Sequence, residues 1–299
     1  MIGAFWNIRG LGQPGKIQCL GDFISNNHVD FLCFSETKRE VIEAHILNGI
    51  SGRISFDWHY LPAINTAGGI LVGLKSDLFE VVGFINKKFC IVATVKNRSD
   101  GFMWHLVAVY GTSYNEFKLD FFAELHDIMD GLTYPALLGG DFNLVRSTAD
   151  KNNGVINSQF SYLFNKWCLM EINIANRKYT WSNNQDSPIF ATIDRVFASI
   201  SWDAHFPLSV VSALPRVGSD HTPLLLDTGA RRVTSPRIFR FEKWWLDHPD
   251  LKKMVIDTWN TSAPGKTAMD IWMNKSELFR KKKLEVGVLI LRLILRRRR

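Results

Sequence analysis

The stretch Leu137–Asn143 ends a short apolar run with two glycines and then places a carboxylate and a carboxamide two residues apart. Consecutive glycines allow a tight turn and a close approach of ligand to backbone. Asp141 and Asn143 point to the same side if the strand continues, and such a pair suits a hydrated metal ion or a water that attacks a phosphate. Because the same residues also form ordinary turns, the role of this stretch depends on which residues elsewhere in the chain could act with it.

Polar residues of related chemistry follow or precede several other strand-like runs. They are Asn7, Glu36, Tyr110, Asp194, Asp220 and His221. Each has an ordinary explanation on its own: a turn for Asn7, a helix cap for Glu36, a core aromatic for Tyr110. Taken together they match phosphodiester hydrolysis, which needs a cation held by oxygen ligands, a base for water and stabilisation of the charged transition state.

The residue types suggest how these tasks are divided. Glu36 and a second carboxylate would hold a Mg²⁺ ion that keeps several waters. Asp141 would orient and deprotonate the attacking water, and Asn143 would position the phosphate. His221 would donate to a non-bridging oxygen, with Asp194 fixing its tautomer and raising its basicity.

Length and composition are typical of a soluble globular protein: 299 residues, 46% hydrophobic and 22% charged. The four cysteines are far apart and form no Cys-x-x-Cys pair, which argues against a zinc site and for thiols in a reducing compartment. The first residues run directly into a polar, glycine-rich stretch, so we expect no secretory signal. The apolar run Val286–Leu295 is short and contains Arg292, so we expect no membrane span.

The net charge of +7 is unevenly distributed. Residues 1–228 contain 18 Lys and Arg against 22 Asp and Glu, a net charge of −4, whereas residues 276–299 alone carry +7. The basic character that usually indicates nucleic-acid binding therefore belongs to the C-terminal third. The basic tail is either an import or nucleic-acid patch or the product of a translated frameshift.

The hydrophobic pattern predicts many strands and fewer helices. Strands are expected at 2–6, 29–34, 70–74, 89–96, 103–110, 136–141, 179–181, 189–198, 208–213 and 222–226, and helices at 16–26, 39–47, 116–129 and 158–170. This mixture predicts an α/β (α+β) fold with two packed sheets covered by helices. We expect a catalytic domain at 1–228, a linker at 229–236 and a helical, basic segment at 237–299 with helices at 241–260 and 267–284.

These motifs resemble the endonuclease/exonuclease/phosphatase superfamily, which includes the abasic-site endonucleases and pancreatic deoxyribonuclease. The matching stretches, in chain order, are Trp6–Gly10, Ser35–Thr37, Tyr110, Gly140–Asn143, Ile193–Arg195 and Ser219–His221. The resemblance implies a four-layer sandwich. It places Glu36 on the metal with Asn7 and Asp220 nearby, Asp141 as the base, Asn143 and Tyr110 on the phosphate, and His221, oriented by Asp194, on the transition state. Arg9 and Trp181 are expected to contact the substrate.

More narrowly, the chain resembles the endonuclease region of plant LINE-type (non-LTR) retrotransposon polyproteins. The pointers are Asn7–Gly12, Glu36–Lys38, Tyr179–Asn183, Ser219–Leu224 and the connector-like Arg240–Trp245. This resemblance implies Mg²⁺-dependent nicking of DNA, with Mn²⁺ as a substitute. We expect a monomer that acts inside the cell, in the nucleus.

The chain departs from the family pattern at two points. Ala191-Thr192 stands before Ile193-Asp194, where the family has a basic residue, and this predicts a weaker phosphate or structural contact. The reverse transcriptase expected downstream is missing, which predicts a truncated or frame-shifted element. Two other functions therefore stay open: a phosphatase or phosphodiesterase acting on a small ester, and an inactive remnant that binds nucleic acid.

Overall fold

The computed structural model describes residues 1–65, 67–152, 163–229 and 249–264, with the short stretches 270–272, 274–275 and 278. The chain divides into two compact units, residues 1–235 and residues 236–299. In the second unit, α6 spans Pro249–Asn260. None of the helices in the described ranges is long and apolar enough to cross a membrane.

The first of two six-stranded sheets combines strands from both ends of the first unit, in the order β13-β14-β1-β2-β4-β3. Its strands are β1 (Ile2–Asn7), β2 (Phe31–Ser35), β3 (Phe56–Leu61), β4 (Ile70–Lys75), β13 (Val210–Ala213) and β14 (Leu224–Asp227). Only β1 and β2 are parallel among these pairs. The helix α1 (Lys16–Asn26) makes the crossover that a parallel pair requires.

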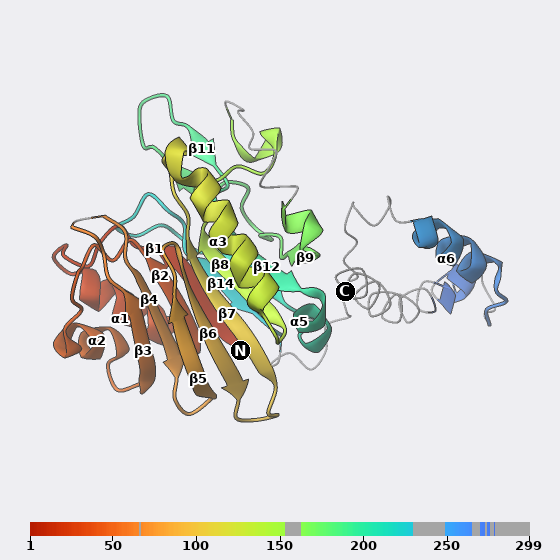
Figure 1. The fold of residues 1–299 in the computed structure, drawn as a ribbon, viewed down its shortest axis with the longest axis horizontal. Helices are drawn as coiled ribbons and strands as arrows, with labels where there is room; N and C mark the ends of the chain where they lie inside the picture. The colour runs from red at the N-terminus through yellow and green to blue at the C-terminus, as the bar shows by residue number, and fades with distance from the viewer. Residues whose placement is uncertain are drawn as a thin grey trace. The chain divides into compact units, whose positions relative to one another are not determined.

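The second sheet has the order β5-β6-β7-β8-β12-β9 and also contains one parallel pair, β7 and β8. Its strands are β5 (Phe79–Asn86), β6 (Cys90–Asn97), β7 (Met103–Tyr110), β8 (Ala136–Asp141), β9 (Leu169–Glu171) and β12 (Asp194–Ser199). The helix α3 (Lys118–Gly131) connects β7 to β8, and α5 (Ile200–His205) follows β12. A small ribbon of β10 (Trp181–Ser182) and β11 (Phe190–Ala191) stands apart from both sheets (Figure 1).

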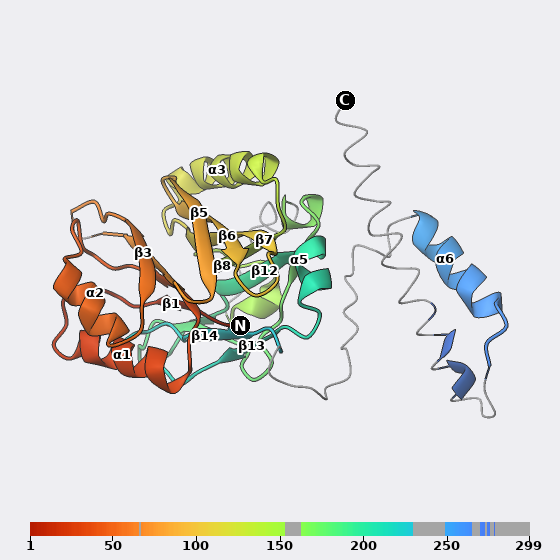
Figure 2. The same ribbon diagram turned by 90° about the horizontal axis from the view of Figure 1, so that it is seen from below.

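The two sheets pack face to face, and helices cover their outer faces (Figure 2). Alternate residues of each strand enter different cores. Phe5 of β1 lies in the core between the sheets, whereas Ala4 and Trp6 pack with α1 and with α2 (Ala44–Ser51). On the other side, α3 buries Phe121 and Leu125 against the second sheet. The predicted four-layer α/β sandwich is therefore confirmed.

Some predicted elements differ from the structure. The helix expected at 39–47 begins only at Ala44. Lys38 N donates to Gly68 O and Arg39 O accepts from Ala63 N, so this stretch bonds to the segment before β4 and not within a helix. The strand expected at 189–198 is interrupted between β11 and β12. Of the helix expected at 158–170, residues 163–166 are helical and 158–162 lie outside the described residues, as do most of the linker, the predicted helix at 267–284 and the basic tail.

Candidate active site

Strand alternation brings four predicted site residues to one edge of the space between the sheets. On β7, β8 and β12, the inner-face residues Ala108, Leu137 and Val196 belong to the central core. On the same faces, Tyr110 lies two residues after Ala108 and Asp141 lies four residues after Leu137. Asp194 lies two residues before Val196. Together with Asn7 at the end of β1, these residues form the polar ends of the four strands. Because β12 is antiparallel to β8, its first residue pairs with the last residue of β8, so Asp194 lies beside Asp141.

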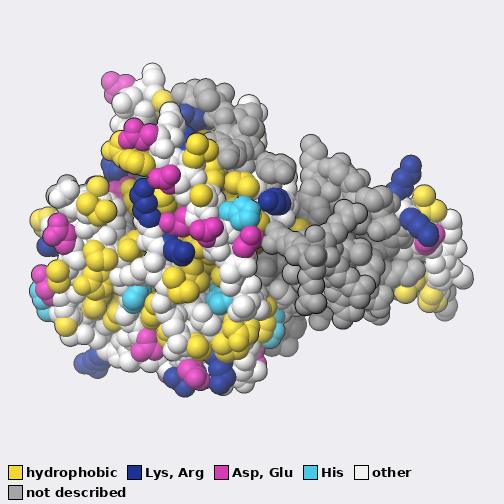
Figure 3. All heavy atoms as spheres, viewed as in Figure 1, with side chains coloured by type: hydrophobic (Ala, Val, Ile, Leu, Met, Phe, Trp, Pro, Cys, Tyr) yellow, Lys and Arg dark blue, Asp and Glu magenta, His cyan; other side chains and the backbone are white. Residues whose placement is uncertain are grey.

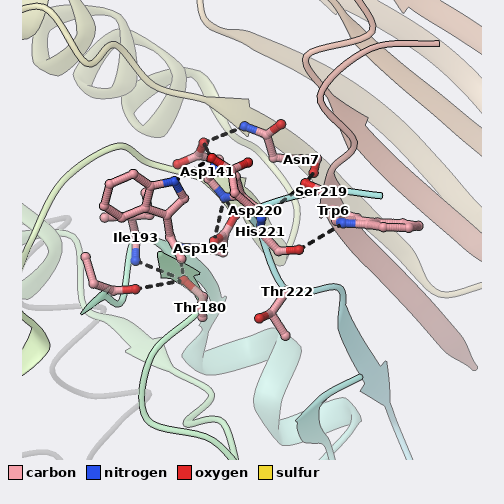
Figure 4. Close-up of polar contacts among 12 residues, drawn as sticks. Trp6, Asn7, Asp141, Thr180, Ile193, Asp194, Ser219, Asp220, His221 and Thr222 are labelled. Carbon is pink, nitrogen blue, oxygen red and sulfur yellow. Dashed lines mark hydrogen bonds and ion pairs between the residues drawn. The ribbon is translucent and has the colours of Figure 1, made fainter. Parts of the chain in front are cut away.

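His221 lies between these two carboxylates (Figure 4). Its Nδ1 is 3.0 Å from each carboxylate oxygen of Asp194, and its Nε2 is 3.7 Å from Oδ2 of Asp141. All three side chains are at most 3% exposed. A carboxylate can only accept, so the proton of Nδ1 points to Asp194 and Nε2 faces Asp141 without a direct hydrogen bond.

The pKa values of Asp141 and of His221 are both raised, for different reasons. Burial raises the pKa of Asp141 to about 7, and the charge of Asp194 acts in the same sense. Burial on its own would lower the pKa of His221, but the charges of Asp194 and Asp141 outweigh it and raise the pKa to about 9. His221 is therefore a cation at neutral pH.

Asp141 and Asn143 meet, although not by the strand alternation we expected. The strand β8 ends at Asp141, and Asn143 has a left-handed backbone with φ of 52°. Its backbone N–H donates to Oδ1 of Asp141 at 2.9 Å, and its Nδ2 lies 3.3 Å from Oδ2 of the same residue and donates to the carbonyl of Gly111. A tight turn, not a continued strand, sets this pair.

Glu36 is held by neutral donors on one side and cations on the other. Asn7 Nδ2 donates to Oε1 of Glu36 at 3.0 Å and to Oδ2 of Asp141 at 2.9 Å, and the Tyr110 hydroxyl donates to the same Oε1 at 3.1 Å. Lys38 lies 3.3 Å from Oε2. Although burial opposes it, the hydrogen bond from Asn7 and the charges of Arg9 and Lys38 lower the pKa of Glu36. Glu36 therefore stays ionised to lower pH than an ordinary glutamate does.

Arg9 links the carboxylates of Glu36 and Asp220. Its NH1 lies 3.5 Å from Glu36 Oε2 and its Nε lies 3.1 Å from Asp220 Oδ1. The indole of Trp181, which we expected to contact substrate, donates to Asp220 Oδ2 at 3.0 Å. The structure therefore brings all predicted site residues together, and both predicted substrate contacts reach the same carboxylate.

Unusual backbone conformations concentrate at this site. Arg9, Glu36, Lys38 and Asn143 all have φ between 52° and 57° without being glycine. Left-handed backbone is costly for such residues and persists only where the surroundings impose it. These turns carry the four side chains away from the strand directions, which is why strand alternation alone does not place them.

Sequence reasoning gave no role to three residues that support the site. Lys38 contacts Glu36, and the Ser219 hydroxyl donates to Asn7 O at 2.7 Å and accepts from His221 N. Thr180 is fully buried, and its Oγ1 accepts from the backbone N–H of Ile193 and of Asp194, each at 3.1 Å (Figure 4). All three lie within the motifs of the family resemblance, but their residue types alone do not predict these contacts.

The unusual Ala191-Thr192 pair makes contacts of its own. Ala191 pairs with Trp181 in the β10–β11 ribbon, and the Thr192 hydroxyl donates to Lys178 O at 2.5 Å. The nearby Arg195 is buried and paired with Asp150 at 2.8 Å and with Glu171. A basic residue that is expected before Ile193 is thus replaced by a backbone-anchored hydroxyl.

Residues 4–221 match the Endonuclease/Exonuclease/phosphatase family, and the chain belongs to this family. The matched range includes the candidate site, that is, the buried Asp141, Asp194 and His221 and the adjoining Glu36 and Asn7. No curated protein sequence matches the chain significantly.

Solved structures share the fold at low identity. The 3′-5′ exonuclease NExo from Neisseria meningitidis is 20% identical, with a TM-score of 0.60 over 76% of this chain and 99% of that one. The AP endonuclease LMAP from Leishmania major is 15% identical, with a TM-score of 0.59 over 75% and 86%. The endonuclease domain of TRAS1, a telomere-specific non-LTR retrotransposon, is 12% identical, with a TM-score of 0.57 over 76% and 97%.

Proposed function

We propose that this chain is a Mg²⁺-dependent phosphodiesterase that nicks nuclear DNA, as a LINE-type retrotransposon endonuclease does. The observation that carries the proposal is the buried group Asp194, His221 and Asp141, beside Glu36 and Asn7, at one edge of the sandwich. The motifs of the LINE-type resemblance and the similarity of fold to the TRAS1 endonuclease domain support it.

Asp141 is the proposed base. Its Oδ1 accepts the backbone N–H of Asn143, and its Oδ2 accepts from Asn7 and faces Nε2 of His221. These partners fix the orientation of the carboxylate, and burial raises its pKa toward neutral, which suits a group that takes a proton from water.

His221 is the proposed donor to the phosphate. It is positively charged, it is fixed by Asp194, and its Nε2 has no direct hydrogen-bond partner among the described residues. A cation at that position stabilises negative charge that develops on a phosphate oxygen. Asn143 and Tyr110 complete the side of the site on which we place the phosphate.

The described residues fit a divalent cation in charge and donor type. Glu36 and Asp220 already share one positive partner, the guanidinium of Arg9, and carboxylate and amide oxygens are the ligands that Mg²⁺ prefers. We propose that Glu36, Asn7 and Asp220 hold the ion. A bound Mg²⁺ supplies charge stabilisation and a more acidic water. Ligand atoms of Asp141, Asp194 and His221 also lie within 4.8 Å of one another, but Asp194 already engages His221 Nδ1.

Incubation of supercoiled plasmid with the purified chain tests the proposal. We expect conversion to nicked circles with Mg²⁺ or Mn²⁺ and no conversion in EDTA. Release of inorganic phosphate from small phosphate esters without nicking would instead identify a phosphatase. Binding of DNA without any hydrolysis, in either metal, would identify an inactive nucleic-acid-binding protein and overturn the proposal.

A further inference from the structure

An anionic strand that enters this site meets a domain with more carboxylates than cations. Residues 1–228 carry a net charge of −4. The cations nearest the catalytic carboxylates are already paired, Arg9 with Glu36 and Asp220, and Lys38 with Glu36. Phosphates that flank the cleaved bond therefore need other partners, because the phosphate backbone supplies most of the non-specific affinity for a nucleic acid.

Two arginines from different segments contact the residues on either side of His221. NH1 of Arg177 lies 3.5 Å from the hydroxyl Oγ1 of Thr222, and NH1 of Arg216 donates to the carbonyl oxygen of Asp220 at 3.3 Å. Arg177 precedes the strand β10, and Arg216 lies on the loop that leads to His221. The guanidinium groups therefore flank the backbone of the catalytic histidine.

Neither guanidinium forms an ion pair with a carboxylate in the described part of the chain. The contrast is with Arg146 and Arg195, which pair with Glu171 or Asp150. Two guanidinium groups that flank the same histidine without a paired carboxylate are both available to an anion, and Arg is suited to bind phosphate with two hydrogen bonds.

We propose that Arg177 and Arg216 bind a backbone phosphate of the nucleic-acid strand next to the phosphate that is cleaved. This inference rests on the proposed function and adds a second phosphate site to it. Such a contact fixes the register of the strand without reading its sequence. It also places positive charge locally, at the edge of a domain that is acidic overall.

The test measures binding of a fluorescein-labelled DNA duplex in EDTA, where no cleavage occurs, as a function of NaCl concentration. We expect the double variant Arg177→Gln/Arg216→Gln to bind about tenfold more weakly, with a slope of log affinity against log salt that is shallower by about 1, as for one lost phosphate contact. The charge-preserving variant Arg177→Lys/Arg216→Lys should keep most of the wild-type slope. It shows whether the weaker binding of the glutamine variant comes from lost charge and not from a folding defect.

Arg98→Gln is the matched control. Arg98 also donates to backbone carbonyls, those of Ser76 and Phe79, and follows β6 at the opposite edge of the sheet. If the double glutamine variant keeps the wild-type slope, as Arg98→Gln should, the inference is wrong. In Mg²⁺, the ratio of plasmid nicking to hydrolysis of bis(4-nitrophenyl) phosphate should fall about tenfold in the double variant. An unchanged ratio would also overturn it. Absence of all hydrolysis by the wild type would refute the proposed function, whereas binding in EDTA would still test the arginines.

Discussion

Asp141 and His221 belong to one buried group, yet their pKa values differ in the order that the proposed mechanism needs, with the base below the acid. Burial raises the pKa of Asp141 to about 7, while neighbouring carboxylates raise the pKa of His221 to about 9. Between these values Asp141 is ionised and His221 is protonated. Two titratable groups that are separated in this way act as base and as acid in the same pH range.

The pH dependence of kcat/KM should therefore be bell-shaped. Activity rises as Asp141 loses its proton near pH 7 and falls as His221 loses its proton near pH 9. Asp194→Asn removes the leading charge that raises the pKa of His221, so the basic limb should move to lower pH. Initial nicking rates at saturating Mg²⁺ across pH 5 to 10 measure both limbs, and a basic limb that stays in place in Asp194→Asn would contradict the role of His221.

Tyr110 contacts Glu36 directly, which gives its hydroxyl a task beyond the predicted phosphate contact. Burial and the charges of Glu36 and Asp141 raise the pKa of Tyr110, so it remains a neutral donor. Tyr110→Phe should raise the Mg²⁺ concentration for half-maximal nicking by about 10-fold to 100-fold, as expected for loss of a hydrogen bond to the proposed metal ligand Glu36. The exposed Tyr134→Phe provides the control. An unchanged requirement for Mg²⁺ would show that Tyr110 does not position Glu36.

At the scale of elements, the buried strands were predictable and the turns were not. The apolar runs that end in Asn7, Tyr110 and Asp141 are readable as strands, because they are continuous apolar segments of strand length that are buried almost throughout. The pairing of Asp194 with Asp141 depends on which distant strands become neighbours, and no local pattern specifies that. The left-handed turns at Glu36 and Asn143 are equally invisible, since neither residue type requires them.

The edge strands β3 and β5 also escaped prediction. In β3 all residues after Phe56 are half-buried, and β5 is mostly exposed or half-buried and carries an irregularity between Val81 and Gly83. An edge strand packs on fewer neighbours, so its hydrophobic pattern is weaker than that of a central strand. The core strands and the site motifs were therefore the most predictable parts of the molecule.

Gly140, near the end of β8, should be sensitive to substitution. Its φ is +139°, and an added Cβ would lie 2.1 Å from the backbone oxygen of Val109, its partner on the parallel strand β7. Gly140→Ala should lower the free energy of unfolding by roughly 2–4 kcal/mol, since neither the conformation nor the space suits a side chain. Gly83→Ala, where a Cβ meets nothing within 4 Å, should change it by less than about 1 kcal/mol. Urea unfolding compares the two, and equal midpoints would refute this explanation.

At the scale of the molecule, the site joins both ends of the first unit. The Trp6 indole donates to His221 O, and Ser219 donates to Asn7 O, so residues more than 200 positions apart share one edge. Among the described residues, three hydrophobic clusters pack beneath this edge: one between the two sheets and one between each sheet and the helices that cover it. Folding of this unit therefore depends on hydrophobic burial, while the polar edge carries the proposed chemistry.

Removal of metal should affect the activity of this unit but not its folding. EDTA should abolish nicking but leave the far-ultraviolet circular dichroism unchanged, because the proposed ligands lie at the edge of a core that is already closed. The Tm should fall by only a few degrees, as expected for loss of a ligand bound in modest excess over its Kd. Renewed Mg²⁺ should restore activity. Unfolding in EDTA would show that the ion is structural and contradict this account.

The most direct test of the central claim is the nicking rate of Asp141→Asn. This change preserves shape and removes the proposed base, so the rate on supercoiled plasmid in Mg²⁺ should fall by about 10²-fold or more. Asp57→Asn, on the edge strand β3 beside Leu74 at the opposite end of the sheet from the site, should nick at the wild-type rate. Equal nicking by Asp141→Asn and wild type would contradict the assignment of this edge as a hydrolytic site.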